Sequence, residues 1–130
     1  NNAGISGRVP LDEMSDQVWD SMIGVNLTGV QRTSRAVVPV MKEQRSGNIV
    51  SISSVAGRSG KANMTHYCST KFGVIGFSQS LALELAPFDV RVNSVCPGIV
   101  RTQMWEVELG EISETKGISI EEAWEMVLSG

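Results

Sequence analysis

The spacing of apolar residues divides most of the chain into alternating helical and extended segments. Apolar residues recur at near-helical spacing from Ser15 to residue 44, and Ser15 followed by Asp16 is typical of a helix start. The short apolar run Asn48–Ser53 predicts a buried strand. A second helix is predicted over Thr65–Ala86, where Pro87 ends it.

Three irregularities interrupt the first helical pattern. Asn26 and Gly29 are poor helix formers in its interior, and Pro39 should kink it. Asn26 is compatible with a simple helix bend, because asparagine competes for backbone hydrogen bonds. Ser46-Gly47 should end the helix, as glycine commonly does.

The last third of the chain begins with a clear pattern and then loses it. Val90, Val92 and Val95 predict a second buried strand, which a sharp turn at Pro97-Gly98 should end. The pattern loosens over Met104–Leu109 into a polar link, and its apolar residues fit either a substrate lid or uncovered core surface. Ser119–Glu122 has the form of a capping box that opens a final helix.

This order of segments predicts an α/β fold. Residues 1–4 would be the tail of a strand, so that strands and helices alternate with short connections, which favours a parallel sheet. We expect the second half of a doubly wound parallel sheet, with residues 1–130 as one partial domain.

Composition excludes several classes of protein. The 130 residues are 42% apolar and 19% charged, which is typical of a globular domain. The net charge of −3 without a basic block argues against nucleic-acid binding, and no apolar run has the length of a membrane span. Cys68 and Cys96 form no metal-type cluster, so we expect no metal site and free thiols in a cytoplasmic protein.

Tyr67 and Lys71 are the clearest candidates for chemistry. They are four residues apart, so on a helix their side chains share one face. A fixed cation beside a phenol favours the phenolate, which would let tyrosine exchange a proton near neutral pH. Ser54, at the end of the preceding strand, could place a hydroxyl in the same pocket. Taken alone, this spacing is more often a half-buried tyrosine beside a solvated lysine.

Several motifs occur together in one order. The chain opens with Asn1-Asn2-Ala3-Gly4, Val25-Asn26 lies inside the first helix, and the run Asn93–Thr102 follows the second. With Tyr67 and Lys71, these motifs resemble the short-chain dehydrogenase/reductase family over about residues 1–105, in its classical type similar to β-ketoacyl reductases and polyol dehydrogenases.

The resemblance implies a Rossmann fold and a set of site residues. Catalytic roles would fall to a tetrad consisting of Asn26, Ser54, Tyr67 and Lys71. The dinucleotide, NAD or NADP, would contact Asn2, Ala3, Gly4, Tyr67, Lys71, Pro97, Gly98, Ile99, Val100 and Thr102.

The resemblance also implies a function: hydride transfer between a nicotinamide cofactor and a carbonyl/alcohol pair, in a homodimer or homotetramer. Met104-Trp105 and the acidic last helix favour small polyols, diols or diketones as substrates. The family's glycine-rich phosphate loop has no counterpart in this sequence, so we expect an internal fragment that is inactive alone. A non-catalytic dinucleotide-binding or regulatory protein on the same fold is the alternative.

Overall fold

The computed structural model describes residues 1–129, without the side chains of Met104 and Val107. It forms two compact units, Asn1–Pro97 and Gly98–Gly130. Each unit has its own internal packing, and the first contains both strands and the longest helix.

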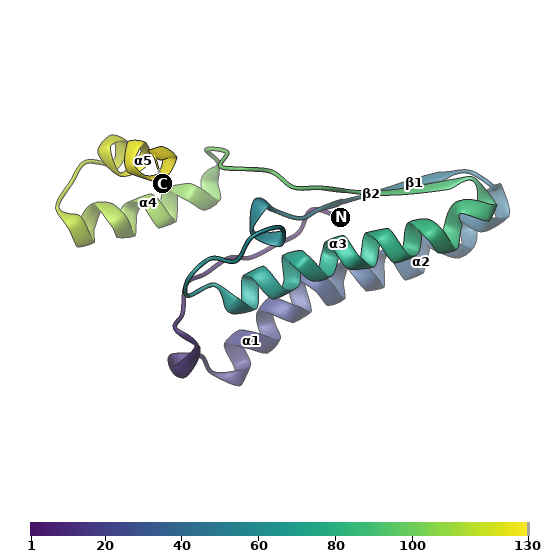
Figure 1. Ribbon diagram of the computed structural model, residues 1–130, viewed down its shortest axis with the longest axis horizontal. Coiled ribbons are helices and arrows are strands. Elements are labelled where there is room, and N and C mark those ends of the chain that lie inside the picture. Colours follow the sequence, from purple (N-terminus) through teal and green to yellow (C-terminus); the bar gives the residue numbers. More distant parts are fainter. Residues whose placement is uncertain (130) are drawn as a thin grey trace. The chain divides into compact units, whose positions relative to one another are not determined.

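The first unit is built on two parallel strands, β1 (Gly47–Ile52) and β2 (Val90–Val95). Helices α2 and α3 lie on one side of this pair (Figure 1). Asn1 extends the sheet at the other edge of β1: its ammonium donates to Val50 O at 2.9 Å, and its carbonyl accepts from Ile52 N at 2.9 Å. This is the parallel pairing pattern. The expected strand tail at residues 1–4 therefore exists as the ladder contacts of Asn1, and residues 2–4 have no regular structure.

The first long helix is broken into three parts: α1 (Asp16–Ile23), a π-helical turn (Gly24–Thr28) and α2 (Gly29–Gln44). The predicted start is confirmed, because Ser15 Oγ accepts a hydrogen bond from Val18 N at 3.3 Å. The predicted interruption at Asn26 is a π-turn, which inserts one extra residue into the helix. Helix α2 continues through Pro39.

The end of α2 differs from the expectation. Arg45, in the left-handed conformation (φ 49°), terminates the helix, and Gly47 is already the first residue of β1. Gly47 does not form a turn; its small size leaves room for the Met41 side chain. A Cβ at that position would stand 2.6 Å from Met41 Sδ and 3.0 Å from Met41 Cβ. Its missing side chain lets the end of α2 pack directly against the start of β1.

The predicted second helix is confirmed as α3 (Thr65–Leu85), followed by a 3₁₀ turn, Ala86–Phe88, that contains Pro87. Its carboxyl-terminal half covers the apolar core of the unit. Leu85 is fully buried there against Ile49, Val90 and Val92 of the two strands. Residues of α2 and α3 that complete this core are Val37, Val38, Met41, Leu81 and Ala82.

The strands bury different residues from those expected. Alternate side chains of β1 point to the same face of the sheet, so Ile49 and Ser51 are buried under the helices while Val50 is 40% exposed. In β2, Val90 and Val92 are buried as predicted, but Val95 is 47% exposed. After β2, residues 96–102 have no regular structure, and the sharp turn expected at Pro97-Gly98 is absent from them.

The second unit consists of α4 (Gln103–Lys116) and α5 (Ile120–Ser129). Helix α5 and its capping box are confirmed: Ser119 N donates to Glu122 Oε2 at 2.8 Å, and Glu122 N donates to Ser119 Oγ at 3.2 Å. Helix α4 replaces the polar link that the sequence predicted, and it ends at Gly117 in the left-handed conformation.

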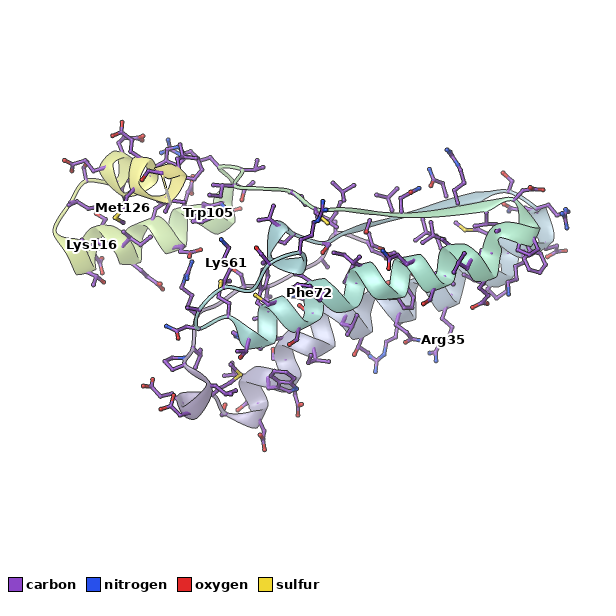
Figure 2. All side chains as sticks on the ribbon, in the orientation of Figure 1. Arg35, Lys61, Phe72, Trp105, Lys116 and Met126 are labelled. Atoms are coloured by element: carbon purple, nitrogen blue, oxygen red, sulfur yellow. The ribbon has the colours of Figure 1, made fainter. Side chains whose placement is uncertain are left out.

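Aromatic and charged side chains join the two helices of this unit. Trp105 lies between α4 and α5 (Figure 2) and meets the ring of Trp124 edge-on, with ring centroids 5.9 Å apart. The Arg101 guanidinium stands 5.5 Å from the Trp124 ring and donates two hydrogen bonds to Glu121, of 3.1 and 2.7 Å. These hydrogen bonds lower the pKa of the Glu121 carboxyl.

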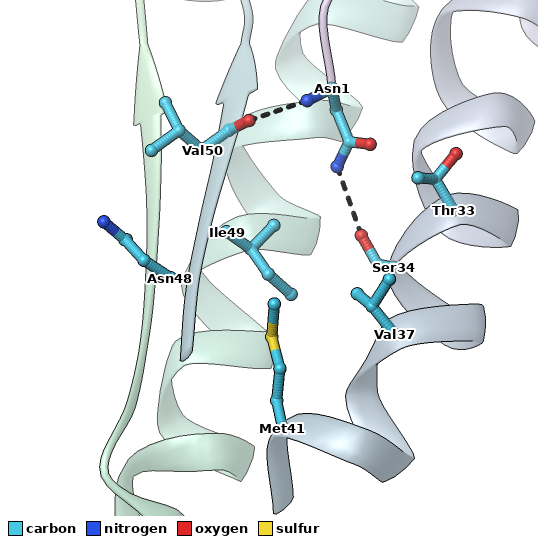
Figure 3. Close-up of a pocket in the computed structure, with 8 residues that line it drawn as sticks. All are labelled: Asn1, Thr33, Ser34, Val37, Met41, Asn48, Ile49 and Val50. Atoms are coloured by element: carbon cyan, nitrogen blue, oxygen red, sulfur yellow. Dashed lines mark hydrogen bonds between the residues drawn. The ribbon is translucent and has the colours of Figure 1, made fainter. Parts of the chain in front are cut away.

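A cleft of about 150 Å³ lies between α2 and the first half of β1. Figure 3 shows Asn1, Ser34 and Met41 around it, with the Asn1 amide donating to Ser34 Oγ at 3.3 Å. This cleft is at the opposite end of β1 from Ser54, so the candidate catalytic residues do not line it. Among residues 1–129, none of the helices is long and apolar enough to cross a membrane.

Candidate functional site

Tyr67 and Lys71 lie on successive turns at the start of α3, as their spacing predicts. The Lys71 ammonium stands 5.5 Å from the centroid of the Tyr67 ring. Lys71 is only 7% exposed, and its Nζ donates to Ile52 O at 3.1 Å. Burial lowers the pKa of the Lys71 ammonium. The pair therefore forms at the carboxyl end of β1 and is held by that strand.

Ser54 lies two residues after the end of β1 and is the N-cap of a 3₁₀ turn, Val55–Gly57. Its Oγ accepts a hydrogen bond from Ala56 N at 3.1 Å, and a hydroxyl that accepts still has its own proton to donate. Parallel pairing continues on both sides of Ser54, through Ser53 N to Val95 O at 2.7 Å and Val55 N to Pro97 O at 3.0 Å. Ser54 and Pro97 thus lie together where the two strands end.

The turn after Ser54 packs against the start of α3. Ala56, Met64 and Cys68 form a small buried cluster, and the partly buried Tyr67 packs against it. This contact brings the strand end that carries Ser54 to the helix face that carries Tyr67. Three of the four predicted catalytic residues, Ser54, Tyr67 and Lys71, therefore gather around one strand end.

Asn26, the fourth, is 1% exposed and joins three segments. Its amide forms a reciprocal pair with the backbone of Ile5: Ile5 N donates to Oδ1 and Nδ2 donates to Ile5 O, both at 2.8 Å. Nδ2 also reaches Thr70 Oγ1 at 3.3 Å, and Thr70 Oγ1 donates to Tyr67 O at 2.7 Å. The Asn26 side chain thus links the segment after Gly4 to the turn of α3 that carries Tyr67.

Gly4 lies close to both Asn26 and Lys71. A Cβ at Gly4 would stand 3.4 Å from Asn26 Oδ1 and 3.7 Å from Lys71 Nζ. The backbone of the opening segment therefore runs past both polar heads, and Gly4 belongs to the same cluster of residues. Asn2 and Ala3, predicted to contact a cofactor, are exposed just before it.

The remaining predicted cofactor contacts lie in the second unit. Ile99 and Val100 are exposed, and Thr102 precedes α4 without capping it through its hydroxyl. Gly98 has open space around its Cβ position. Their roles as cofactor contacts stay predictions.

Sequence reasoning missed three buried polar residues beside the site. Ser53 Oγ donates to Lys71 O at 2.8 Å, Thr70 bridges Asn26 and Tyr67 as described, and His66 is 1% exposed beside Gly7. A signal for Ser53 was present, because it falls on the same strand face as Ile49 and a polar residue there must find a partner. The helical positions of His66 and Thr70 carried no comparable signal.

Comparison with known proteins decides the family. The model of the family described as short chain dehydrogenase matches residues 1–111. The chain belongs to the short-chain dehydrogenase family. The chain is 46% identical over 106 residues to a 3-oxoacyl-[acyl-carrier-protein] reductase of Thermotoga maritima, covering 82% of this chain and 43% of the relative. It is 38% identical over 129 residues to a putative ketoacyl reductase of Streptomyces coelicolor, covering 98% of this chain and 49% of the relative.

Similar solved structures confirm the predicted α/β class. They also confirm that the chain corresponds to half of a doubly wound fold. Actinorhodin polyketide ketoreductase with NADPH matches 99% of this chain and 50% of its own, with a TM-score of 0.91 at 37% identity. A 3-oxoacyl-[acyl-carrier protein] reductase with bound NAD from Brucella melitensis matches 83% of this chain and 43% of its own, with a TM-score of 0.75 at 44% identity. The chain spans about half the length of these relatives or less.

We expect His66 to make the stability of this short-chain dehydrogenase sensitive to acid. Its two ring nitrogens have no hydrogen-bond partner among the described residues, and burial lowers its pKa below the usual 6.5. Below pH 6.5 the unfolded chain binds a proton that the folded chain refuses, so the free energy of unfolding falls, by at most about 1.4 kcal/mol per pH unit. His66→Phe removes this group while keeping a buried ring.

Urea denaturation at pH 7.5, 6.5 and 5.5 measures the effect on the protein expressed from its complete gene. We expect wild type to lose more stability than His66→Phe between pH 6.5 and 5.5, and this extra loss to be about a third as large between 7.5 and 6.5, where the unfolded histidine only begins to bind its proton. Parallel losses in both proteins over the lower interval would show that His66 does not titrate on unfolding.

Proposed function

We propose that this chain supplies the proton-handling site of a nicotinamide-dependent oxidoreductase that interconverts a carbonyl and an alcohol. The observation that carries the proposal is the buried Lys71 ammonium 5.5 Å from the Tyr67 ring, at a strand end that also carries Ser54. Ligands of open α/β sheets bind at the carboxyl ends of the strands, so the cluster stands where a substrate would.

The residues fit one half of a nicotinamide dinucleotide. Lys71 and Tyr67 offer donors for a ribose and a substrate oxygen, and the narrow space at Gly4 lets backbone approach them closely. The relatives solved with NADPH and with NAD support the same cofactor class, NAD or NADP, for this protein. When bound, the nicotinamide supplies or accepts the hydride.

The four side chains divide the remaining work. Tyr67 gives a proton to the carbonyl oxygen in reduction and takes it back in oxidation. The Lys71 cation favours the phenolate of Tyr67, and Ser54 holds the substrate oxygen by a hydrogen bond as charge develops on it. Asn26 acts through position, because its reciprocal pair with Ile5 holds the Gly4 segment beside Lys71, where a water returns the proton.

The names of the relatives favour a ketoacyl substrate. The polyol, diol or diketone class that Met104 and Trp105 favoured in the sequence is untested. Two relatives whose match extends through these residues are a putative ketoacyl reductase and a polyketide ketoreductase. We therefore propose reduction of a ketone on an acyl chain as the first reaction to assay, with polyols as the second panel.

We further propose that the protein forms a homodimer or homotetramer through α2 and α3. Both helices expose large apolar side chains: Val40 on α2, and Phe72 and Leu83 on α3, where Leu83 is 80% exposed. Figure 2 shows Phe72 on α3. Such surface is costly in water and is typical of an interface. Sedimentation of the complete gene product as monomer alone at micromolar concentration would contradict this.

Tyr67→Phe tests the chemistry. The substitution keeps the ring against Ala56 and Met64 and removes the hydroxyl, so we expect turnover to fall about 10³-fold while dinucleotide affinity changes less than about twofold. Ser69→Ala, an exposed change on the same turn of α3, is the control and should keep full turnover. Normal turnover in Tyr67→Phe would remove Tyr67 from the mechanism. Wild type that binds dinucleotide but turns over no ketone or alcohol would favour the non-catalytic alternative.

Residues 1–130 alone should be inactive. Dinucleotide phosphates in this architecture are held by a glycine-rich turn before a helix N-terminus, and this sequence contains none. We expect isothermal titration of the isolated chain to detect no micromolar dinucleotide binding, and the chain to self-associate through the exposed sheet face with Val50 and Val95. Micromolar binding together with ketone reduction would show that these residues suffice.

A further inference from the structure

Two consecutive residues at the end of β1, Ile52 and Ser53, bind Lys71. One contacts its side chain and the other its main chain. Its side-chain Nζ donates to Ile52 O at 3.1 Å, and its main-chain O accepts from Ser53 Oγ at 2.8 Å. The next residue in the chain is Ser54. The order Ile52, Ser53, Ser54 therefore places the two attachments of Lys71 immediately before the serine of the candidate site.

Gly57 packs against the hydrogen bond between Ser53 and Lys71. A Cβ at Gly57 would stand 2.5 Å from Ser53 Oγ, 2.7 Å from Lys71 O and 2.9 Å from Lys71 C. Two of these three atoms are main chain and cannot rotate away. Gly57 has no positive φ, so what it supplies is space. Ser53 and Gly57 are both buried, and the 3₁₀ turn after Ser54 can close on α3 only because residue 57 lacks a side chain.

We propose that Ser53 and Gly57 are positioning residues that fix the main chain of Lys71 against the end of β1. The Lys71 ammonium can contact Ile52 O and the Tyr67 ring together only while the Lys71 backbone stands at the right distance from the strand end. The Ser53 hydrogen bond fixes the position of α3 along the direction of β1. The missing side chain at Gly57 lets the turn after Ser54 approach the main chain of α3. The catalytic meaning of this attachment rests on the proposed function, but the attachment itself does not.

Ser53→Ala and Ser51→Ala form a matched pair of variants. Both serines are buried on the same face of the same strand end, and both hydroxyls are hydrogen-bonded. Ser51 Oγ accepts from the Asn1 amide at 3.2 Å, whereas Ser53 Oγ donates to Lys71. A merely structural effect of removing a buried hydroxyl appears in both variants, and an effect on Lys71 appears only in Ser53→Ala.

The first measurement is the titration of Lys71 in the protein expressed from its complete gene, followed by NMR of isotope-labelled lysine side chains. Burial lowers the pKa of Lys71. If the contacts that bury its ammonium loosen and water enters, this pKa should rise toward the usual 10.5. We expect this upward shift in Ser53→Ala and not in Ser51→Ala. The measurement needs no turnover.

The second measurement is steady-state kinetics on the same variants. We expect kcat to fall on the order of tenfold in Ser53→Ala with KM changed less than about twofold, since displacing a catalytic group affects the reacting geometry more than binding. The alkaline-rising limb of alcohol oxidation should move to higher pH, because a more distant ammonium favours the phenolate less. Ser51→Ala should retain the wild-type profile.

Gly57→Ala and Gly60→Ala give an independent test if Ser53→Ala does not fold. Gly60 lies three residues later in the same loop with nothing within 4 Å of its Cβ position. Gly57→Ala should displace the Lys71 main chain and reproduce both changes, while Gly60→Ala reproduces neither. The double variant Ser53→Ala/Gly57→Ala should regain little of the turnover that Gly57→Ala loses, because the clash with Lys71 O remains.

The outcomes separate the two proposals. Unchanged Lys71 titration in both Ser53→Ala and Gly57→Ala overturns the positioning role, whatever the kinetics show. A shifted titration in a protein with no turnover on any ketone or alcohol supports the positioning role and overturns the proposed function. A shift in Ser51→Ala equal to that in Ser53→Ala also overturns the positioning role, since any buried hydroxyl would then have the same effect.

Discussion

The pairing of buried polar side chains is the constraint on which the arrangement of the first unit depends. A buried donor or acceptor left without a partner costs about 1–3 kcal/mol, so most such groups find one. Here the partners lie far apart in sequence. Asn26 pairs with the backbone of Ile5, Ser53 with the carbonyl of Lys71, and Ser51 with the amide of Asn1. Each pair fixes one segment relative to another, and the three together determine where the opening segment, β1 and α3 meet.

Helix α3 shows how this differs from apolar packing. Its carboxyl-terminal half buries Leu85 against Val90 and Val92, a contact that has no direction and tolerates small shifts. Its amino-terminal half buries Thr70 and Lys71, whose hydrogen bonds with Asn26 and Ile52 O are directional. The apolar half packs against the core, and the polar half makes the directional contacts that fix its position. The candidate catalytic side chains all stand at the polar half, where a precise position is needed.

Much of the fold could be predicted because each strong signal was local. Spacing placed Tyr67 and Lys71 on one helix face, Ser15 marked a helix start, and Ser119 with Glu122 marked another. The failures arose where a distant contact decided the outcome. Helix α4 has few apolar positions, and its Leu109 is buried only because the helix belongs to the second unit, which the local pattern does not reveal.

The candidate site shows the same division. Sequence alone indicated candidate residues for the chemistry, because reactive side chains at a fixed spacing are recognisable. It did not indicate which residues hold them. No pattern along the chain singled out Gly57, yet a Cβ there would meet Lys71 O at 2.7 Å. Ser53 was one more residue of the predicted strand Asn48–Ser53. Supporting roles such as these depend on three-dimensional contacts between segments, and no pattern along a single segment encodes them.

The proposed function gives the burial of Lys71 a physical reason. An ammonium that is 7% exposed loses hydration, which lowers its pKa, and a nearby carboxylate would be the usual compensation. Among the described residues, the acceptor that it finds is instead a neutral carbonyl, Ile52 O. A carboxylate would stabilise the folded protein more, but it would also cancel the positive field at the Tyr67 ring. A neutral acceptor holds the ammonium in place and leaves its field directed at the phenol. In the proposed mechanism, the desolvation of Lys71 is therefore the cost of a cation whose field acts on the phenol.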